Sequence, residues 1–236
     1  MQRRRRIVGV LCIAVAIALL VIQNPHQNPA PQKTETPAQT QQSAIESSSP
    51  LARAVLDELP VEGRAPKTGY ERAQFGDGWL LVGGCDTRNI ILWRDLSNPV
   101  STTDCKVTSG VLADPYTGTT IVFSRGKDTS DLVQIDHVVA LSNAWQTGAQ
   151  LLSVERRVEL ANDPLELLAV DGNANQVKSD GDAATWLPSN KAFRCQYVAR
   201  QIAVKAKYGL WVTDPEKAAM ARVLEACPEQ LVPTPS

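Results

Sequence analysis

The chain has 236 residues, two histidines and a net charge of −1 at pH 7. Residues 1–50 hold five of the 24 bases and two of the 25 acids, so 24 minus 5 leaves 19 bases and 25 minus 2 leaves 23 acids, a net charge of −4 for the rest. A globally basic surface is therefore excluded as the means of binding nucleic acid, and any site for a polyanion must be local.

Residues 1–50 have the features of an export segment followed by a linker. Four arginines at 3–6 precede an uncharged apolar run, an order typical of a signal peptide or signal anchor over residues 1–23. The run is short for a spanning helix, but no small-residue cleavage site follows it, so we favour an uncleaved anchor through which the protein contacts the membrane. Residues 24–50 are rich in Pro, Gln, Ser and Thr and predict a disordered linker. We expect residues 51–228 to fold as one extracytoplasmic domain, with a flexible tail at 229–236.

The first half of this domain predicts short, mixed elements. A short helix is expected at 51–59, a loop at 63–70 and a strand at 79–82, whereas the apolar run at 90–93 fits either a strand or a helix. Two strand patterns, 105–112 and 119–123, flank the turn residues Asp-Pro-Tyr-Thr-Gly at 114–118, and this order predicts a β-hairpin.

The second half predicts two further strands and four helices. The strands are expected at 133–138 and 165–170, the second followed by an Asn-rich turn at 171–175, and residues 142–150 and 154–162 favour helices. Apolar residues at helical spacing then predict a helix from 192 to the stop signal Gly209. The capping box that begins at Thr213 starts the last helix.

Four cysteines follow the linker, and an even number in an exported domain predicts two disulfides, with three possible connectivities. Cys195 and Cys227 each lie on the apolar face of one of the last two helices. This placement favours the pairs Cys195–Cys227 and Cys85–Cys105 over the other connectivities and over four free thiols.

The pair Asp136-His137 is the strongest chemical signal. His26 lies in the linker, so His137 is the histidine of the domain, and it ends an apolar strand pattern beside a carboxylate. The order Asp-His, strand, Asn-rich turn and Lys178 is what a one-metal phosphodiesterase needs: a base for water, oxygen ligands for a hard cation, and a positive charge near the phosphate. Because consecutive strand residues point to opposite faces, the strand must end or bulge at this pair.

In order and spacing, eight segments resemble the HNH (His-Me finger) nucleases, and within them the exported branch related to the GmrSD C-terminal nuclease domain. The segments are GRAP at 63–66, GCDTRN at 84–89, DPYTG at 114–118, QIDHVVAL at 134–141, ANDPL at 161–165, LLAVDG at 167–172, DAATWLP at 182–188 and YVAR at 197–200.

The resemblance implies an α+β fold: a ββα-metal core with an added N-terminal β-hairpin region and two closing C-terminal helices, braced by two disulfides. It implies that His137 is the general base, that Asp136 and Asn175 bind the metal, that Asn162 orients the base or its loop, and that Lys178 faces the phosphate. Asn175 stands where the usual pattern has histidine, and an all-oxygen ligand set favours one Mg²⁺ or Mn²⁺ ion over Zn²⁺. Asn173 is a rival for the position of Asn175.

Further side chains could contact the substrate, with DNA favoured over RNA. Arg88 could clamp a phosphate, and an acid-free stretch across the first closing helix could follow a nucleic-acid backbone. The candidates are Asp86, Arg88, Asn173, Lys191, Arg194 and Arg200.

The sequence thus predicts a monomeric, anchored or secreted endonuclease. One alternative is an exported, non-catalytic binding or scaffolding module on a decayed HNH fold, in which Asp136 and His137 brace the core. Another is a hydrolase of cell-wall polymer, but no Cys-His or Ser-His-Asp order supports it.

Overall fold

The computed structural model describes residues 49–127 and 129–234, which belong to the unit Glu46–Ser236. The predicted signal segment at 1–23 and the linker up to residue 48 lie outside the described residues. Within the residues described, no helix has the length and apolar character needed to cross a membrane.

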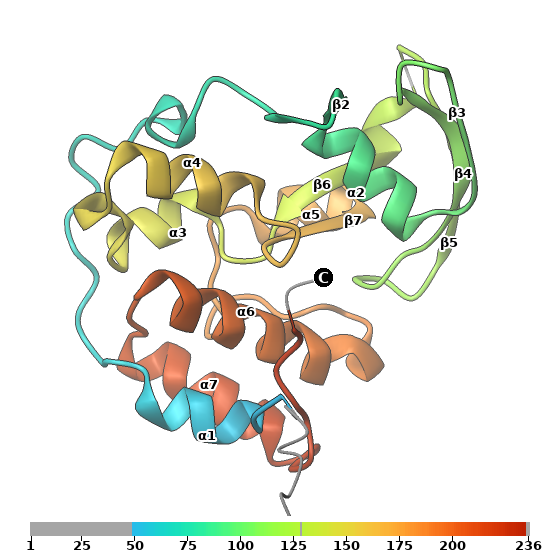
Figure 1. The fold of residues 1–236 in the computed structure, drawn as a ribbon. Helices are drawn as coiled ribbons and strands as arrows, with labels where there is room; N and C mark the ends of the chain where they lie inside the picture. The colour runs from blue at the N-terminus through green and yellow to red at the C-terminus, as the bar shows by residue number, and fades with distance from the viewer. Residues whose placement is uncertain (1–48, 128, 235–236) are drawn as a thin grey trace, which may run out of the picture. The chain divides into compact units, whose positions relative to one another are not determined.

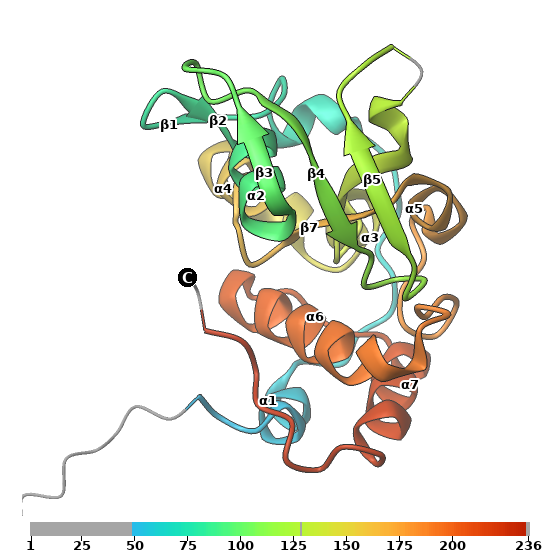
Figure 2. The same cartoon turned by 90° about the vertical axis from the view of Figure 1, so that its right-hand side faces the viewer.

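The described strands form three small antiparallel sheets (Figures 1 and 2). The predicted hairpin is confirmed: β4 (Val107–Ala113) pairs with β5 (Thr120–Ser124), and β3 (Ser97–Ser101), which the sequence did not predict, pairs with β4. The other sheets are β1 (Leu81–Val82) with β2 (Cys85–Asp86), and β6 (Val133–His137) with β7 (Leu167–Asp171).

Seven α-helices and four 3₁₀ turns connect these strands in the described part of the chain. They are α1 (Ala52–Glu58), η1 (Arg72–Phe75), α2 (Thr87–Asp95), η2 (Ser130–Leu132), α3 (Leu141–Gln146), η3 (Ala149–Leu151), α4 (Val154–Asn162), α5 (Gly172–Lys178), η4 (Lys191–Phe193), α6 (Arg194–Tyr208) and α7 (Asp214–Leu224). The capping box of α7 is confirmed, since Thr213 and Glu216 bond each other's backbone N–H groups. Gly209 ends α6 in the left-handed conformation, with φ 65°.

An aspartate caps a helix at two segments: the run at 90–93, which the sequence left open between strand and helix, and the segment at 171–175, which it predicted as a turn. Residues 90–93 belong to α2, whose N-cap Asp86 accepts a hydrogen bond from the backbone N–H of Asn89. The predicted turn at 171–175 is the start of α5, because Asp171 accepts from the backbone N–H of Ala174. A short polar segment with an initial aspartate is compatible with both a turn and a cap, and the tertiary context decides.

The β6–β7 pair separates two hydrophobic cores. Val133, Ile135 and Leu167 on one face pack with α2 and the three-stranded sheet, whereas Leu168 and Val170 on the other face join the larger core. Helices α1, α6 and α7 lie side by side on this larger-core side (Figure 1). The β6–β7 pair is therefore covered on both faces, while one edge of β6 has no neighbouring strand in the described sheets.

Both predicted disulfides are present. Cys85–Cys105 ties β2 to the loop before β4, and Cys195–Cys227 ties α6 to the chain after α7. The domain also extends past its predicted end at 228, because Leu231 forms a β-bridge with Leu51 and Val232 is buried. Residues 229–232 thus belong to the folded unit, whereas the last two residues of the predicted tail lie outside the description.

Candidate active site

His137, the last residue of β6, is held so that one ring nitrogen is free. Nε2 lies 3.0 Å from the carbonyl oxygen of Ala161, and because a carbonyl can only accept, Nε2 must donate and Nδ1 carries the lone pair. Nδ1 has no hydrogen-bond partner among the described residues. It is also absent from the unbonded side-chain atoms that solvent cannot reach, so water can contact it. Burial, and next the charge of Arg72, lowers the pKa of His137 to about 3, so the imidazole is neutral at pH 7.

A cavity of about 560 Å³ lies against the open edge of β6 and is lined by both Asp136 and His137. The two side chains leave opposite faces of the strand, as regular strand geometry requires. Because the cavity borders the end and the open edge of β6, it reaches both faces, and no bulge is recorded in the β6–β7 pairing. The sequence required β6 to end or bulge at Asp136 and His137 if both were to reach one site, and here the strand ends.

Trp79 covers the imidazole, and no role was predicted for it from the sequence. Its ring lies parallel to that of His137, with an interplanar angle of 4° and centroids 5.8 Å apart. The next residue, Leu80, donates its backbone N–H to Oδ1 of Asn162 at 2.9 Å, and Nδ2 of Asn162 donates to the carbonyl of Val158. Asn162 ends α4 next to Ala161, so it ties the Trp79 segment to the same helix end that orients His137.

Asp136 is buried and paired. Its carboxylate accepts from Nζ of Lys178 at 3.0 Å and from the hydroxyl of Tyr116. Burial raises the pKa of Asp136, and the positive charge of Lys178 opposes this shift. The carboxylate of Glu166 is also buried; it accepts from the backbone N–H of Val139, and burial raises its pKa well above the usual range.

Lys178 does not face the cavity, which differs from the prediction. Its side chain is fully buried, and Nζ donates to Asp136 and, at 2.8 Å, to the carbonyl of His137. A buried ammonium needs such partners, because burial of an unpaired charge is very costly. Lys178 therefore holds Asp136 and the end of β6 in place, and it cannot at the same time contact a phosphate in the cavity.

Asn175, and not Asn173, lines the cavity. Its Nδ2 donates to Oε1 of Gln134 at 2.9 Å, which leaves Oδ1 without a donor among the residues described, while Asn173 is exposed on the other side of α5. Of the two rivals, Asn175 is thus the one that shares the cavity with Asp136.

The donor set fits a hydrated divalent ion. A carboxylate offers about four acceptor positions, of which Lys178 and Tyr116 use two in Asp136. Mg²⁺ is typically bound through one or two protein oxygens and keeps several waters, which suits Asp136 with Oδ1 of Asn175. Residues 49–127 and 129–234 contain no group of three or more His, Cys, Asp or Glu side chains placed to hold a metal.

Three bases line the cavity, and one of them has no protein partner among the described residues. Lys67 pairs with Asp180 at 3.1 Å, and Arg88, a predicted substrate residue, donates to the carbonyl of Val133 at 3.4 Å. Arg72 of η1 is exposed and makes no hydrogen bond or ion pair within the part of the chain described. Arg72 is not predicted from the sequence, because a lone base in a loop gives no local signal.

The remaining predicted substrate residues lie elsewhere and have structural partners. Asp86 caps α2, Arg194 donates to the carbonyl of Pro188, and Arg200 donates to the carbonyls of Pro164 and Leu165. Lys191 is exposed on η4, away from the lining of the His137 cavity. The basic residues of α6 do not form the continuous track that the sequence suggested.

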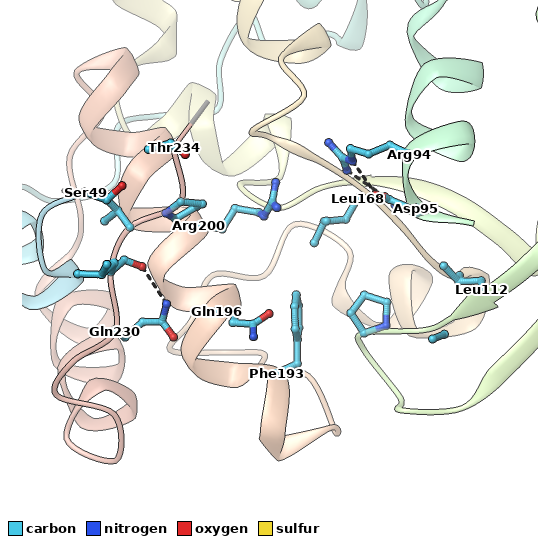
Figure 3. A pocket seen from close by; sticks show the side chains of 16 residues that line it. Ser49, Arg94, Asp95, Leu112, Leu168, Phe193, Gln196, Arg200, Gln230 and Thr234 are labelled. Carbon is cyan, nitrogen blue, oxygen red and sulfur yellow. Dashed lines mark hydrogen bonds and ion pairs between the residues drawn. The ribbon is translucent and has the colours of Figure 1, made fainter. Parts of the chain in front are cut away.

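A larger cavity, of about 670 Å³, shares no lining residue with the His137 cavity; Figure 3 shows it from close by. Its two arginines are bound to protein groups: Arg94 pairs with Asp95, and Arg200 bonds backbone carbonyls. Arg94 and Asp95 also bond the carbonyl of Leu167 and the N–H of Ala169, so they cap the outer edge of β7. Size alone therefore does not mark the reactive site.

Comparison with known proteins identifies the family of the domain. The family model of the C-terminal domain of GmrSD restriction endonucleases matches residues 88–223. An uncharacterized secreted protein of Arthroderma benhamiae is 36% identical over 217 residues, which cover 91% of this chain and 98% of the relative. No solved structure matches the chain.

Proposed function

Since this chain belongs to the family of the GmrSD restriction endonuclease C-terminal domain, we propose that it is a metal-dependent endonuclease acting on nucleic acid outside the cytoplasm. DNA is the favoured substrate, because the family is defined by restriction endonucleases. Two disulfides suit an oxidising compartment, and the Arthroderma relative is a secreted protein. The N-terminal segment would direct export.

The observation that carries the proposal is the orientation of His137. With Nε2 donating to Ala161, the free Nδ1 can accept a proton from water in the cavity. The resulting hydroxide attacks the phosphorus, and the bond from phosphorus to the leaving sugar oxygen breaks. The bond from Nε2–H to the Ala161 carbonyl raises the pKa of His137 but does not offset burial and the charge of Arg72. The negative charge of a bound phosphate would raise this pKa toward the operating pH, which a general base requires.

The elements β6, β7 and α5 would form a ββα-metal core in the proposed enzyme. Asp136 from the first strand and Asn175 from the helix would hold one Mg²⁺ or Mn²⁺ ion, which would supply positive charge to the phosphate and the leaving oxygen. Lys178 would act as a positioning residue for Asp136, and Asn162 as a positioning residue for the end of α4 and the Trp79 segment.

Arg72 takes the place that the sequence assigned to Lys178. Its guanidinium lines the cavity beside His137 and has no partner among the described residues, so its donors are available to phosphate oxygens. A bidentate clamp of this kind fixes the phosphate and stabilises the charge that develops in the transition state.

The test is nicking of supercoiled plasmid and cutting of single-stranded DNA by the full chain with Mg²⁺, Mn²⁺ or EDTA. We expect His137→Ala to abolish nicking without loss of the folded state, and EDTA to stop the wild-type protein. His26→Ala, which changes the chain's other histidine, is the matched control and should cut normally. Cutting that persists in His137→Ala or in EDTA would refute the mechanism. Absence of hydrolysis by the wild-type chain with every metal would favour the alternative, a binding module on a decayed nuclease fold.

A further inference from the structure

A second, smaller cavity of about 170 Å³ lies beside His137. It shares Arg72, Trp79, His137 and Leu141 with the larger cavity and is more enclosed. Its other walls include the buried ring of Phe75 and the backbone of Gly78. The two cavities therefore meet at the proposed general base and at the proposed phosphate clamp.

The walls of the small cavity suit a flat heterocycle. Trp79, Phe75 and Leu141 provide aromatic and aliphatic surface, and no carboxylate lines the cavity. The indole N–H of Trp79 has no hydrogen-bond partner in the described residues and is not among the solvent-inaccessible atoms, so it can donate to a ligand. A side chain at Gly78 would meet no atom within 4 Å, and its absence leaves this part of the wall open.

One nucleotide can occupy both cavities at once. A nucleobase is joined to its phosphate through one sugar, so a base can enter the small cavity while the adjacent phosphate meets Arg72 and His137 in the larger one. Base–aromatic stacking accepts every base, because each has a π-face. In a duplex the same base is paired and stacked, and its extrusion costs a few kcal/mol.

We propose that the small cavity binds one unpaired nucleobase next to the phosphate that is cut, and hence that the substrate is nucleic acid that is single-stranded at the cleavage site. This inference rests on the proposed nuclease function. It adds Trp79 and Phe75 as base-binding residues and assigns the selection of unpaired strands to them.

The experiment uses the full chain, Mg²⁺ and end-labelled oligonucleotides of one sequence, single-stranded or annealed to a complement. A third oligonucleotide carries one abasic nucleotide, and cleavage is mapped bond by bond. We expect the single strand to be cut at least about tenfold faster than the duplex. The abasic nucleotide should reduce cutting at one bond beside it by roughly tenfold, with distant bonds of the same strand as internal reference.

Trp79→Leu should lower single-strand cutting and remove the local effect of the abasic nucleotide. Trp93→Leu is the matched control, because Trp93 is exposed on α2 and does not line the small cavity. Equal cutting of single strand and duplex, or a cleavage pattern unchanged by the abasic nucleotide, would overturn this inference and leave the nuclease function standing. No cutting of any oligonucleotide would overturn both. If Trp79→Leu does not fold, the cleavage pattern of wild-type protein on the abasic oligonucleotide still tests whether a base is bound next to the cut phosphate.

Discussion

Replacing Lys178 with methionine should destabilise the folded unit far more than it would if this lysine only met a phosphate. The side chain of Lys178 is 0% exposed, and Nζ lies 3.0 Å from Oδ1 of Asp136 and 2.8 Å from the carbonyl of His137. Methionine has a similar length, so it leaves little empty space. It does leave a buried carboxylate with Tyr116 as its remaining side-chain donor.

Breaking one partner of a buried ion pair costs about 3–5 kcal/mol. For a unit of this size, each kcal/mol lowers Tm by about 2–4 °C, so the variant should melt roughly 6–20 °C below wild type. Lys67→Met is the matched control, since Lys67 pairs with Asp180 at the surface, where the two side chains are 51% and 50% exposed. A surface pair contributes about 0–1 kcal/mol, so this Tm should change by no more than about 4 °C.

Thermal melts by circular dichroism and the nicking assay, run on both variants, separate the two roles of Lys178. A large fall in Tm together with lost nicking agrees with a residue that holds Asp136. If Lys178→Met melts within about 4 °C of wild type, the range expected for the surface control, and yet loses activity, then Nζ acts on the substrate and the positioning argument is wrong.

Two other substitutions test supporting contacts. Asn162→Ala frees the Trp79 segment from α4 and should lower kcat by up to about 100-fold through misplacement of the site. It should cost only about 1 kcal/mol of stability. A normal kcat would refute this role. Lys205→Met removes the partner of the buried Glu216. Burial raises the pKa of Glu216 and the Lys205 charge lowers it, so without Lys205 the folded-state pKa lies still further above the unfolded value. Stability of the variant should then fall as pH rises above about 4.3, and equal losses of Tm at pH 4 and pH 8 would contradict it.

The sequence predicts the elements whose signals are local. The hairpin at 107–124 follows from turn residues between two β patterns, α7 from its capping box, and both disulfides from the helix faces that carry Cys195 and Cys227. β3 was not predicted because Ser97–Ser101 contains Asn and Pro and has little apolar patterning. It is a strand because β4 provides the pairing edge.

The sequence predicts the site residues that lie within its motif, and it misses those that a distant segment of the chain contributes. Asp136, His137 and Asn175 share one cavity, because β6 pairs with β7, and α5, which follows β7 directly, packs against both strands. Arg72 and Trp79 come from a separate segment that Asn162 and the core bring to the same place. Such long-range placement has no local signal in one sequence.

The orientation of Lys178 follows from treating residues 172–178 as a helix and not as a turn. Asn175 and Lys178 are three residues apart on α5, so they share a side of the helix, and they bond Gln134 and Asp136, which are two apart on one face of β6. Side chains three residues apart on the helix thus meet side chains two residues apart on the strand, and Lys178 points to the strand.

The residues of this segment that line the cavity with Asn175 are Gln176, Ser179 and Asp180, and none of them is a base. With 100° between successive helix residues, Gln176 lies on the opposite side of Asn175 from Lys178. A cation for the phosphate must therefore come from another element, and among the bases lining the cavity Lys67 and Arg88 already have protein partners in the described chain. Arg72 is the base that remains, which is why we assign the phosphate contact to η1 and not to α5.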